Sequence, residues 1–206
     1  MEELTEGSRA IEVDQWFSSD AQLHRLYPRP IQILAEKHWT PLRIAHLATR
    51  FLVPYGDENV KVLDIGSGVG KFCLAGGYYR PRASFFGVEQ RKHLVNHAKT
   101  ARAMLDLQNV HFFAMNVTEL DFRQFDHFYF YNSFYENLLD TSKIDETIIC
   151  SPHLYNYYNR VLYKKLAAMP PGTRVVTFHC VGVKIPPGYL LVEEHEGTLL
   201  QCWLKV

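Results

Sequence analysis

The sequence predicts a three-layer α/β fold: a doubly wound, mostly parallel seven-stranded sheet with N-terminal helices and a C-terminal antiparallel β-hairpin. The first observation is that five short, almost continuous apolar runs alternate with helical patterns after residue 60. Such runs are typical of strands covered on both faces of a parallel sheet. The second observation is a pair of strand-like runs, 188–195 and 198–206, that flank Glu196-Gly197 and are typical of a hairpin.

Residues 1–56 are expected to form helices. Thr40-Pro41 is typical of a helix start, with threonine as the N-cap and proline at the first helical position. Apolar residues then recur at helical spacing until Val53-Pro54-Tyr55-Gly56, which ends the helix. We therefore expect two parts, an N-terminal helical cap over residues 1–56 and a larger α/β domain over residues 57–206.

The larger part is expected to alternate strand and helix along the chain. Ser151-Pro152 repeats the combination of N-cap and proline and begins the last helix. Ligands of parallel sheets bind outside the carboxyl ends of the strands, so the residues that follow each strand are the first candidates for a site. The expected strands cover residues 60–66, 84–89, 110–116, 127–132 and 173–182, and the expected helices cover residues 69–79, 90–107 and 152–168.

Composition narrows the class of protein. Lys plus Arg and Asp plus Glu count 22 each, so the formal net charge is zero, which argues against a broad electrostatic grip on nucleic acid or anionic membrane. The acidic, polar N-terminus is not typical of a signal peptide, and no apolar run approaches the ~20 residues that span a membrane. Four scattered cysteines are expected to be free buried thiols. These features favour a cytoplasmic protein without membrane partners.

The segment DIGSGVGKF, residues 64–72, lies between an expected strand and an expected helix. A phosphate-binding P-loop needs glycine where the chain has Ile65, and Ser or Thr where it has Phe72. A dinucleotide fingerprint G-x-G-x-x-G matches poorly, because the third glycine comes one position early. The pattern acidic-x-G-x-G-x-G matches completely, through Asp64, Gly66, Gly68 and Gly70.

This last pattern resembles motif I of class I S-adenosylmethionine-dependent methyltransferases, which implies a Rossmann-like domain. Glycines let the backbone approach a bulky ligand, and Asp64 supplies negative charge near a cationic one. Glu89, at the end of the second strand, would accept hydrogen bonds from the two ribose hydroxyls of an adenosine ligand. NAD would use the same carboxylate, so Glu89 indicates adenosine binding without identifying the cofactor. The resemblance implies S-adenosyl-L-methionine as cofactor, held by Asp64, Gly66, Ser67, Gly68, Gly70, Glu89, Gln90, Asn116, Val117 and Thr40.

Two of these assignments have structural alternatives. Asn116 has the residue type of the family's adenine-facing position, but an ordinary asparagine turn explains it nearly as well. Thr40 precedes a helix whose free N–H groups would favour the cofactor carboxylate, while the alternative is an ordinary cap beside a packed Trp39. The family also has a helix between its fifth and sixth strands, for which residues 183–188 are too short.

The stretch after the fourth strand contains the expected catalytic residues Asn132, Phe134 and Tyr135. Methyl transfer needs a nucleophile held in line with the sulfonium methyl, and a carbonyl at Asn132 would orient the lone pair of a nitrogen. The stretch resembles the [DN]-P-P-[FY] motif of enzymes that methylate planar nitrogens, but Ser133 and Phe134 replace both prolines. It equally resembles the Asn-x-Phe turn of non-SET protein-lysine methyltransferases. Those enzymes also favour a G-S-G-x-G loop and a G-V-E strand end, which Gly87-Val88-Glu89 resembles.

The resemblance implies an S-adenosylmethionine-dependent methyltransferase acting on a protein side chain or another amine, with nucleic acid less expected. A nicotinamide-dependent oxidoreductase, a non-catalytic cofactor-binding domain, and an Asn132 that only caps a turn are the alternatives. No metal site is expected, because His93 and His97 lack a third ligand and are expected to be exposed. Lys71 is expected to be solvated, and residues 136–150 to form part of the substrate mouth.

Overall fold

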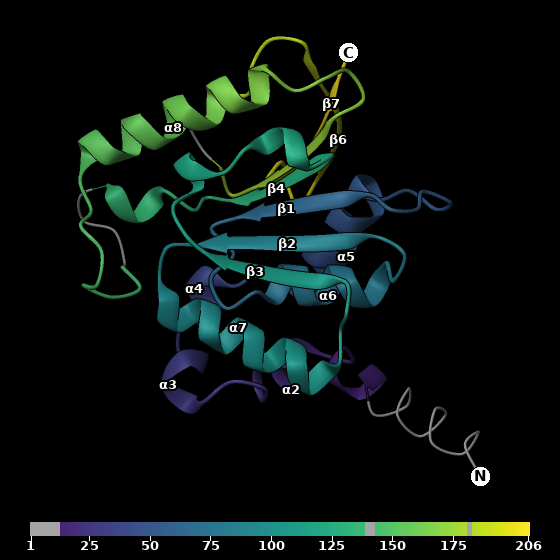
Figure 1. Ribbon diagram of the computed structural model, residues 1–206, viewed down its shortest axis with the longest axis vertical. Coiled ribbons are helices and arrows are strands. Elements are labelled where there is room, and N and C mark those ends of the chain that lie inside the picture. Colours follow the sequence, from purple (N-terminus) through teal and green to yellow (C-terminus); the bar gives the residue numbers. More distant parts are fainter. Residues whose placement is uncertain (1–12, 139–142, 181–182) are drawn as a thin grey trace.

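The computed structural model describes residues 13–138, 143–180 and 183–206 (Figure 1). These residues form one seven-stranded sheet in the order β3-β2-β1-β4-β5-β7-β6. Strands β1 to β5 pair in parallel, whereas β7 is antiparallel to its neighbours β5 and β6, which confirms the predicted sheet. The strands are β1 (Lys61–Ile65), β2 (Ser84–Glu89), β3 (Val110–Ala114), β4 (His127–Tyr131), β5 (Arg174–Phe178), β6 (Tyr189–His195) and β7 (Leu200–Lys205).

Helices cover both faces of the sheet, which confirms the three predicted layers (Figure 1). Side chains alternate along each strand, so Val62 of β1 joins the core under the N-terminal helices, α6 and α7, while Leu63 joins the core under α8. The helices are α2 (Asp20–His24), α3 (Arg29–Gln32), α4 (Ala35–His38), α5 (Leu42–Leu52), α6 (Lys71–Tyr79), α7 (Lys92–Leu105) and α8 (Pro152–Ala167).

The aromatic strand β4 lies at the centre of the sheet, between β1 and β5. Phe128, Tyr129 and Phe130 are all buried. The ring of Tyr129 stacks on Phe72 of α6, with centroids 3.8 Å apart, and its hydroxyl lies 2.9 Å from the Thr40 hydroxyl. The aromatic run is therefore core packing, and it delivers the residues that follow it to the carboxyl edge of the sheet.

The start of α5 differs from the prediction. Pro41 is the N-cap and the helix begins at Leu42, so Thr40 does not cap it. The Thr40 hydroxyl pairs with Tyr129 instead, and the N–H of Leu42 donates to Asp20 Oδ1 at 3.0 Å. A carboxylate from α2 thus takes the capping role, an interaction that the local sequence does not contain.

Strand β5 is shorter than the predicted strand 173–182. It ends at Phe178, because His179 has a φ of 51° and turns the chain out of the sheet. Residues 181 and 182 lie outside the described residues, as do residues 1–12 of the expected cap and residues 139–142 of the expected mouth. Residues 183–188 contain no helix, so in the described part the chain passes from β5 towards the hairpin through a short loop.

Lys71, expected to be solvated, is buried, with 4% of its surface exposed. Its ammonium group forms an ion pair with Asp20 and lies 2.9 Å from His24 Nε2, so two side chains of α2 cover the first residue of α6. Burial lowers the pKa of Lys71, while the hydrogen bond to Asp20 opposes that change. The prediction was wrong because α2 covers this position from 47 and 51 residues away in the sequence.

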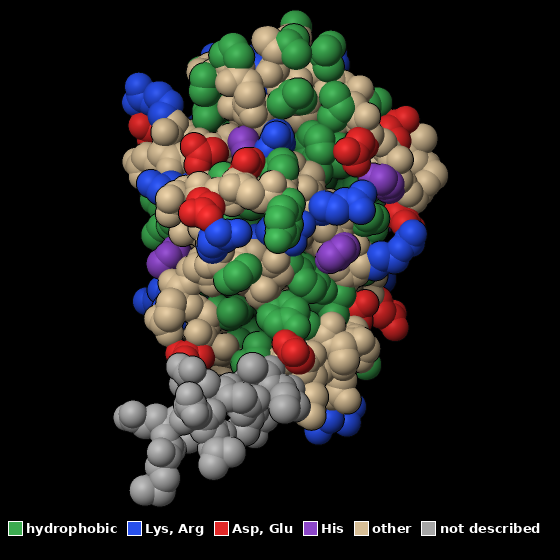
Figure 2. All heavy atoms as spheres, turned by 90° about the vertical axis from the view of Figure 1, so that its right-hand side faces the viewer, with side chains coloured by type: hydrophobic (Ala, Val, Ile, Leu, Met, Phe, Trp, Pro, Cys, Tyr) green, Lys and Arg blue, Asp and Glu red, His purple; other side chains and the backbone are tan. Residues whose placement is uncertain are grey.

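The surface at the amino ends of the parallel strands carries charges of both signs side by side (Figure 2). On that face, Lys and Arg side chains are interspersed with Asp and Glu, as the balanced composition leads one to expect. No helix in the described ranges has the length and apolar character needed to cross a lipid bilayer.

Candidate active site

A cavity of about 920 Å³ lies at the carboxyl ends of β1, β2 and β4, where the topology places a ligand site. Its wall combines the glycine loop after β1, the end of β2, the residues after β3, and the turn after β4 with the connection that follows it. The N-terminal segment from Leu34 to Trp39, Leu94 of α7 and His179 after β5 complete it. Of the sequence-predicted site residues, those on the wall are Gly66, Gly68, Glu89, Gln90, Val117, Asn132, Phe134 and Tyr135.

The glycine loop lies tightly between β2 and the turn after β4. The N–H groups of Gly66 and Ser67 both donate to the Val88 carbonyl, at 2.9 and 3.0 Å. Gly66 has a φ of 76°, and a Cβ there would overlap Ser133, which leaves glycine as the residue that fits. Gly68 also has a positive φ, of 53°, but its missing side chain faces open space at the cavity wall. The loop thus leaves room for a ligand at Gly68.

Asp64 and Ser67 do not line the main cavity but border a smaller adjoining space, together with Thr40. Asp64 is buried and accepts a hydrogen bond from the Cys73 thiol at 3.7 Å. Burial raises the pKa of Asp64 to about 8. Ser67 Oγ is buried without a partner in the described part of the chain. Gly70 borders neither space. It has a φ of 83° at the turn into α6, and a Cβ there would overlap the Phe112 ring.

Glu89 ends β2 with its carboxylate at the cavity. One oxygen accepts the N–H of Arg91 at 2.8 Å, and the other accepts the N–H of Gly68 at 3.3 Å. Burial raises the pKa of Glu89, while the backbone hydrogen bond and the charge of Arg91 lower it. The carboxylate is therefore oriented by the backbone of two separate loops.

Asn116 fits the turn interpretation. Its Oδ1 accepts the N–H of Thr118 at 3.0 Å and so caps the 3₁₀ turn Val117–Glu119. Its amide donates to Gln90 Oε1 and to the Tyr158 hydroxyl, each at 3.0 Å. Asn116 thus lies behind the wall, and its neighbours Val117 and Gln90 lie on it.

The turn after β4 places Asn132 on the cavity wall in a left-handed conformation, with a φ of 43°. Its N–H lies 3.3 Å from Cys180 Sγ, and its side-chain amide has no hydrogen-bond partner among the described residues. Phe134 is buried against Phe130 and Tyr158, whereas Tyr135 is 48% exposed. Asn132 and Tyr135 are thus open to a ligand, and Phe134 is a buried part of the same wall.

Several wall residues were missed by sequence reasoning. Leu34, Lys37, His38 and Trp39 form the wall contributed by the N-terminal segment, whereas Thr40, the residue expected there, does not line the main cavity. Burial lowers the pKa of His38. The sequence feature that could have indicated this part of the wall was Trp39, which lies next to the predicted helix start. The remaining residues that were not assigned to the site include Leu94, Arg91, Met115 and His179, whereas Glu136 and Ile144 belong to the stretch 136–150 that was expected to form part of the substrate mouth.

The histidine pair on α7 and the four cysteines do not line this cavity. His93 is exposed and His97 is partly buried, and His93 Nε2 lies 3.3 Å from Asp145. All four cysteines are free, Cys73 and Cys202 buried and the others partly buried. In the described ranges, the one group with three potential ligand atoms close together is Glu193, His195 and Cys202 on the C-terminal hairpin, and none of these lines the cavity.

Comparison with known proteins gives matches of one kind. A family model described as "Methyltransferase domain" matches residues 56–164, more than half of the chain. Two curated relatives, from Synechococcus strains JA-3-3Ab and JA-2-3B'a(2-13), are each named tRNA (guanine-N(7)-)-methyltransferase and are 47% and 46% identical over 55 residues. That match covers 27% of this chain and 23% of each relative, so the chain spans only a small part of their length.

Solved structures share the fold. TrmN from Thermus thermophilus superposes with a TM-score of 0.57 and 17% identity, over 86% of this chain and 53% of that one. An RNA methyltransferase from Salinibacter ruber, in complex with S-adenosyl-L-homocysteine, gives a TM-score of 0.56 and 21% identity, over 81% and 93% of the two chains. The nicotinamide-dependent alternative finds no support in these matches. The family match, the fold and the glycine loop agree, and the chain belongs to the class I S-adenosylmethionine-dependent methyltransferase family.

Proposed function

We propose that this chain is an active methyltransferase that transfers a methyl group from S-adenosylmethionine to a nitrogen atom of an amine, with a protein side chain as the favoured acceptor. The observation that carries the proposal is the placement of Asn132. It follows β4 on the wall of the cavity that Gly68 and Glu89 also line, and its side-chain amide has no partner in the described part of the chain.

The chemistry asks mainly for alignment. The sulfonium methyl is already activated, so transfer forms a bond from the nitrogen lone pair to the methyl carbon and breaks the bond from that carbon to sulfur. Holding the two reactants in line can supply ~7–11 kcal/mol of the barrier. In the proposal, Glu89 and the glycine loop hold the adenosine end, and the Asn132 carbonyl accepts an N–H of the nucleophile. Tyr135 and the buried Phe134 wall the acceptor side.

A nucleobase nitrogen of RNA is the second candidate acceptor. The curated relatives named as tRNA methyltransferases favour it, and so do the rings of Tyr131 and Tyr135 on the cavity wall, against which a base could stack. The zero formal net charge weighs against it, because RNA binding usually draws on an excess of basic side chains.

The first experiment tests cofactor use and the role of Asn132. Calorimetry with S-adenosylmethionine and S-adenosylhomocysteine should show binding to the wild-type chain, and no heat with either would reject the proposal. Asn132→Gly keeps the left-handed backbone but removes the amide. We expect this variant to bind the cofactor within about twofold of wild type and to lose about 100-fold in methyl transfer, the scale of a lost positioning contact. Unchanged transfer in Asn132→Gly would support an Asn132 that only caps a turn, and no transfer by the wild-type chain would support a non-catalytic domain.

The second experiment identifies the acceptor. Extract from cells lacking the gene is incubated with the protein and cofactor carrying a labelled methyl group, then divided and treated with protease or with ribonuclease. A protein acceptor predicts label that protease releases and ribonuclease does not. The opposite result would favour the RNA acceptor, and mass spectrometry of the labelled fraction would then identify the nitrogen.

A further inference from the structure

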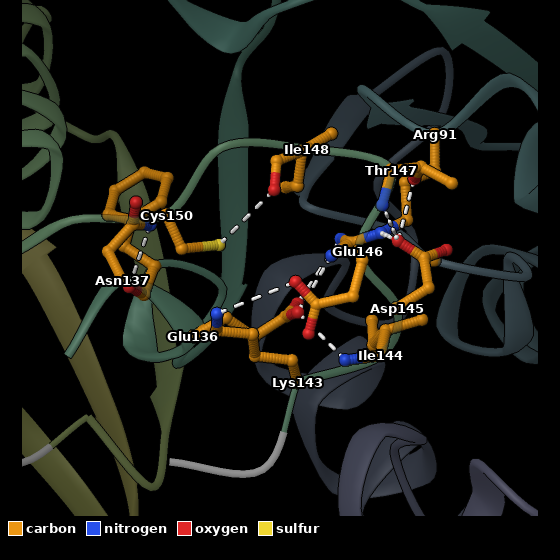
Figure 3. Close-up of polar contacts among 12 residues, drawn as sticks. Arg91, Glu136, Asn137, Lys143, Ile144, Asp145, Glu146, Thr147, Ile148 and Cys150 are labelled. Carbon is orange, nitrogen blue, oxygen red and sulfur yellow. Dashed lines mark hydrogen bonds and ion pairs between the residues drawn. The ribbon is translucent and has the colours of Figure 1, made fainter. Parts of the chain in front are cut away.

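Arg91 is a buried arginine that contacts three carboxylates beside the cofactor cavity. Figure 3 shows two of them, Glu136 and Asp145. Only 3% of its side chain is exposed. Its two terminal nitrogens donate to both oxygens of Glu136, at 3.2 and 2.7 Å, and its Nε donates to Asp145 at 3.0 Å. A terminal nitrogen also lies 3.9 Å from Glu89. Two-point pairing of this kind fixes geometry as well as charge.

The same carboxylates hold the backbone of the connection between β4 and α8. Glu136 accepts the N–H of Ile144 at 2.9 Å, and Asp145 accepts the N–H of Thr147 at 2.9 Å. Glu136 and Ile144 line the cavity next to the turn that contains Asn132. At its other end, the backbone N–H of Arg91 donates to Glu89. One residue thus joins the cofactor side of the cavity to its acceptor side.

We infer that Arg91 is a positioning residue of this methyltransferase, which holds the Glu89 carboxylate ready for the cofactor and fixes the acceptor wall through Glu136 and Asp145. The effect of Arg91 on catalysis rests on the proposed function. Its structural part, the link between the two walls, stands on the hydrogen bonds alone.

The charges around Glu89 give Arg91 a second effect. Glu136 faces Glu89 with negative charge and raises the pKa of Glu89, and Glu89 in turn adds to the burial that raises the pKa of Asp64 in β1. His38 lies near Glu136 and Arg91, and burial lowers the pKa of His38, which favours its neutral form. Arg91 is the cation that lowers the pKa of Glu89 against burial. The ribose hydroxyls donate hydrogen bonds to the ionised form of the Glu89 carboxylate. Without Arg91 the pKa of Glu89 should rise, so that, as pH falls, cofactor binding is lost at a higher pH than in wild type.

The test measures two quantities on the purified full-length protein. Calorimetric affinity for S-adenosylhomocysteine is followed from about pH 6 to about pH 9, a range in which shifted carboxylates titrate. Hydrogen exchange is followed at the amides of Ile144 and Thr147, a measurement that needs no bound ligand. Arg91→Met removes both the charge and the donors, and Arg91→Lys keeps only the charge. Arg123→Met is the matched control, because Arg123 pairs with Asp121 on the exposed surface.

For Arg91→Met we expect affinity at neutral pH to fall about tenfold or more, with recovery as pH rises, and faster exchange at both amides. Arg91→Lys should keep the wild-type pH profile but show faster exchange at both amides, since lysine cannot donate two parallel hydrogen bonds to Glu136. Glu136→Gln should move the pH profile in the opposite direction, because it removes a charge that raises the pKa of Glu89.

A wild-type pH profile together with wild-type exchange in Arg91→Met would overturn the inference. If Arg91→Met does not fold, two other results decide the inference: the pH profile of Glu136→Gln and the rate of hydrogen exchange in Arg91→Lys. Wild-type values for both would equally overturn the inference. Failure of the proposed function is distinguishable: wild type would then not bind S-adenosylhomocysteine, while the exchange comparison would still report on the link between the walls.

Discussion

Among single residues, Asp64 gives a prediction about stability and pH. Its pKa is raised from an ordinary value of 3.8 to about 8 by burial, so the folded protein keeps a proton that the unfolded chain loses. A raised folded-state pKa contributes stability that is complete below about pH 4 and is lost as pH rises through about 8, by up to ~1.4 kcal/mol per unit. Asp64→Asn should therefore gain stability relative to wild type as pH rises from about 5 to 8.

Urea unfolding of both proteins at several pH values measures this difference. Asp121→Asn is the control: Asp121 is exposed and Arg123 lowers its pKa, so Asp121 is ionised in both states over this range, and the difference from wild type should not change with pH. A constant difference between wild type and Asp64→Asn across this range would show that Asp64 is not protonated in the free protein.

At the residue scale, the surroundings of buried charged residues could not be predicted from the sequence. The predicted glycine loop and Glu89 lie where the pattern places them, because neighbouring residues in a strand-to-helix turn determine their surroundings. Burial of Lys71 and Arg91 could not be predicted in that way. The carboxylates to which their side chains donate hydrogen bonds lie 45 to 54 residues away, and only the packing of the layers brings them together. A charged residue near a site carries no local sign of which distant carboxylate will meet it.

Secondary-structure elements were largely predictable. Strand β2 has the predicted bounds, and β1, β3 and β4 end within two residues of prediction, because buried parallel strands show continuous apolar runs. Helix α8 begins as predicted: the Ser151 hydroxyl accepts the N–H of Leu154 at 3.2 Å. The errors, at the start of α5 and the end of β5, come from contacts or backbone angles that tertiary packing decides.

The glycine loop as an element gives a paired prediction. Gly68 and Gly70 both have positive φ, so alanine at either position carries the ~1–2 kcal/mol cost of a left-handed L-residue. A Cβ at Gly68 meets open space at the cavity wall, whereas a Cβ at Gly70 would overlap the Phe112 ring and Ala98. Gly70→Ala should therefore lose about 2–4 kcal/mol of unfolding free energy and Gly68→Ala about 1–2.

Cofactor binding should show the reverse order. Gly68→Ala places a methyl group at the cavity wall and should weaken binding of S-adenosylhomocysteine more than Gly70→Ala does, in the fraction that remains folded. Chemical denaturation and calorimetry on the same two variants supply both quantities. Equal losses of stability, or weaker binding in Gly70→Ala, would contradict the assignment of one glycine to the ligand and the other to packing.

At the scale of the whole molecule, the N-terminal helices and the sheet share one hydrophobic core. Leu23, Ala45, Ala48 and Leu52 are fully buried in the same cluster as residues of β1, β2, α6 and α7. Polar contacts follow the same path, since the Tyr27 hydroxyl donates to the Val69 carbonyl at 3.0 Å. The expected boundary after residue 56 remains a prediction about sequence organisation. The shared core argues that the two parts do not fold separately.

Deletion of residues 1–56 tests that argument. The truncated chain would expose the face of the sheet and of α6 that α5 covers, and Lys71 would lose its ion pair with Asp20. We expect no cooperative thermal transition and no near-ultraviolet circular dichroism from this variant, with apolar dye binding instead. In the full-length chain, Leu23→Ala should cost about 2–5 kcal/mol while unfolding stays cooperative, which reports the same contact without removing the segment. A truncated chain that unfolds cooperatively and binds S-adenosylhomocysteine as the full chain does would instead establish residues 57–206 as an independent domain.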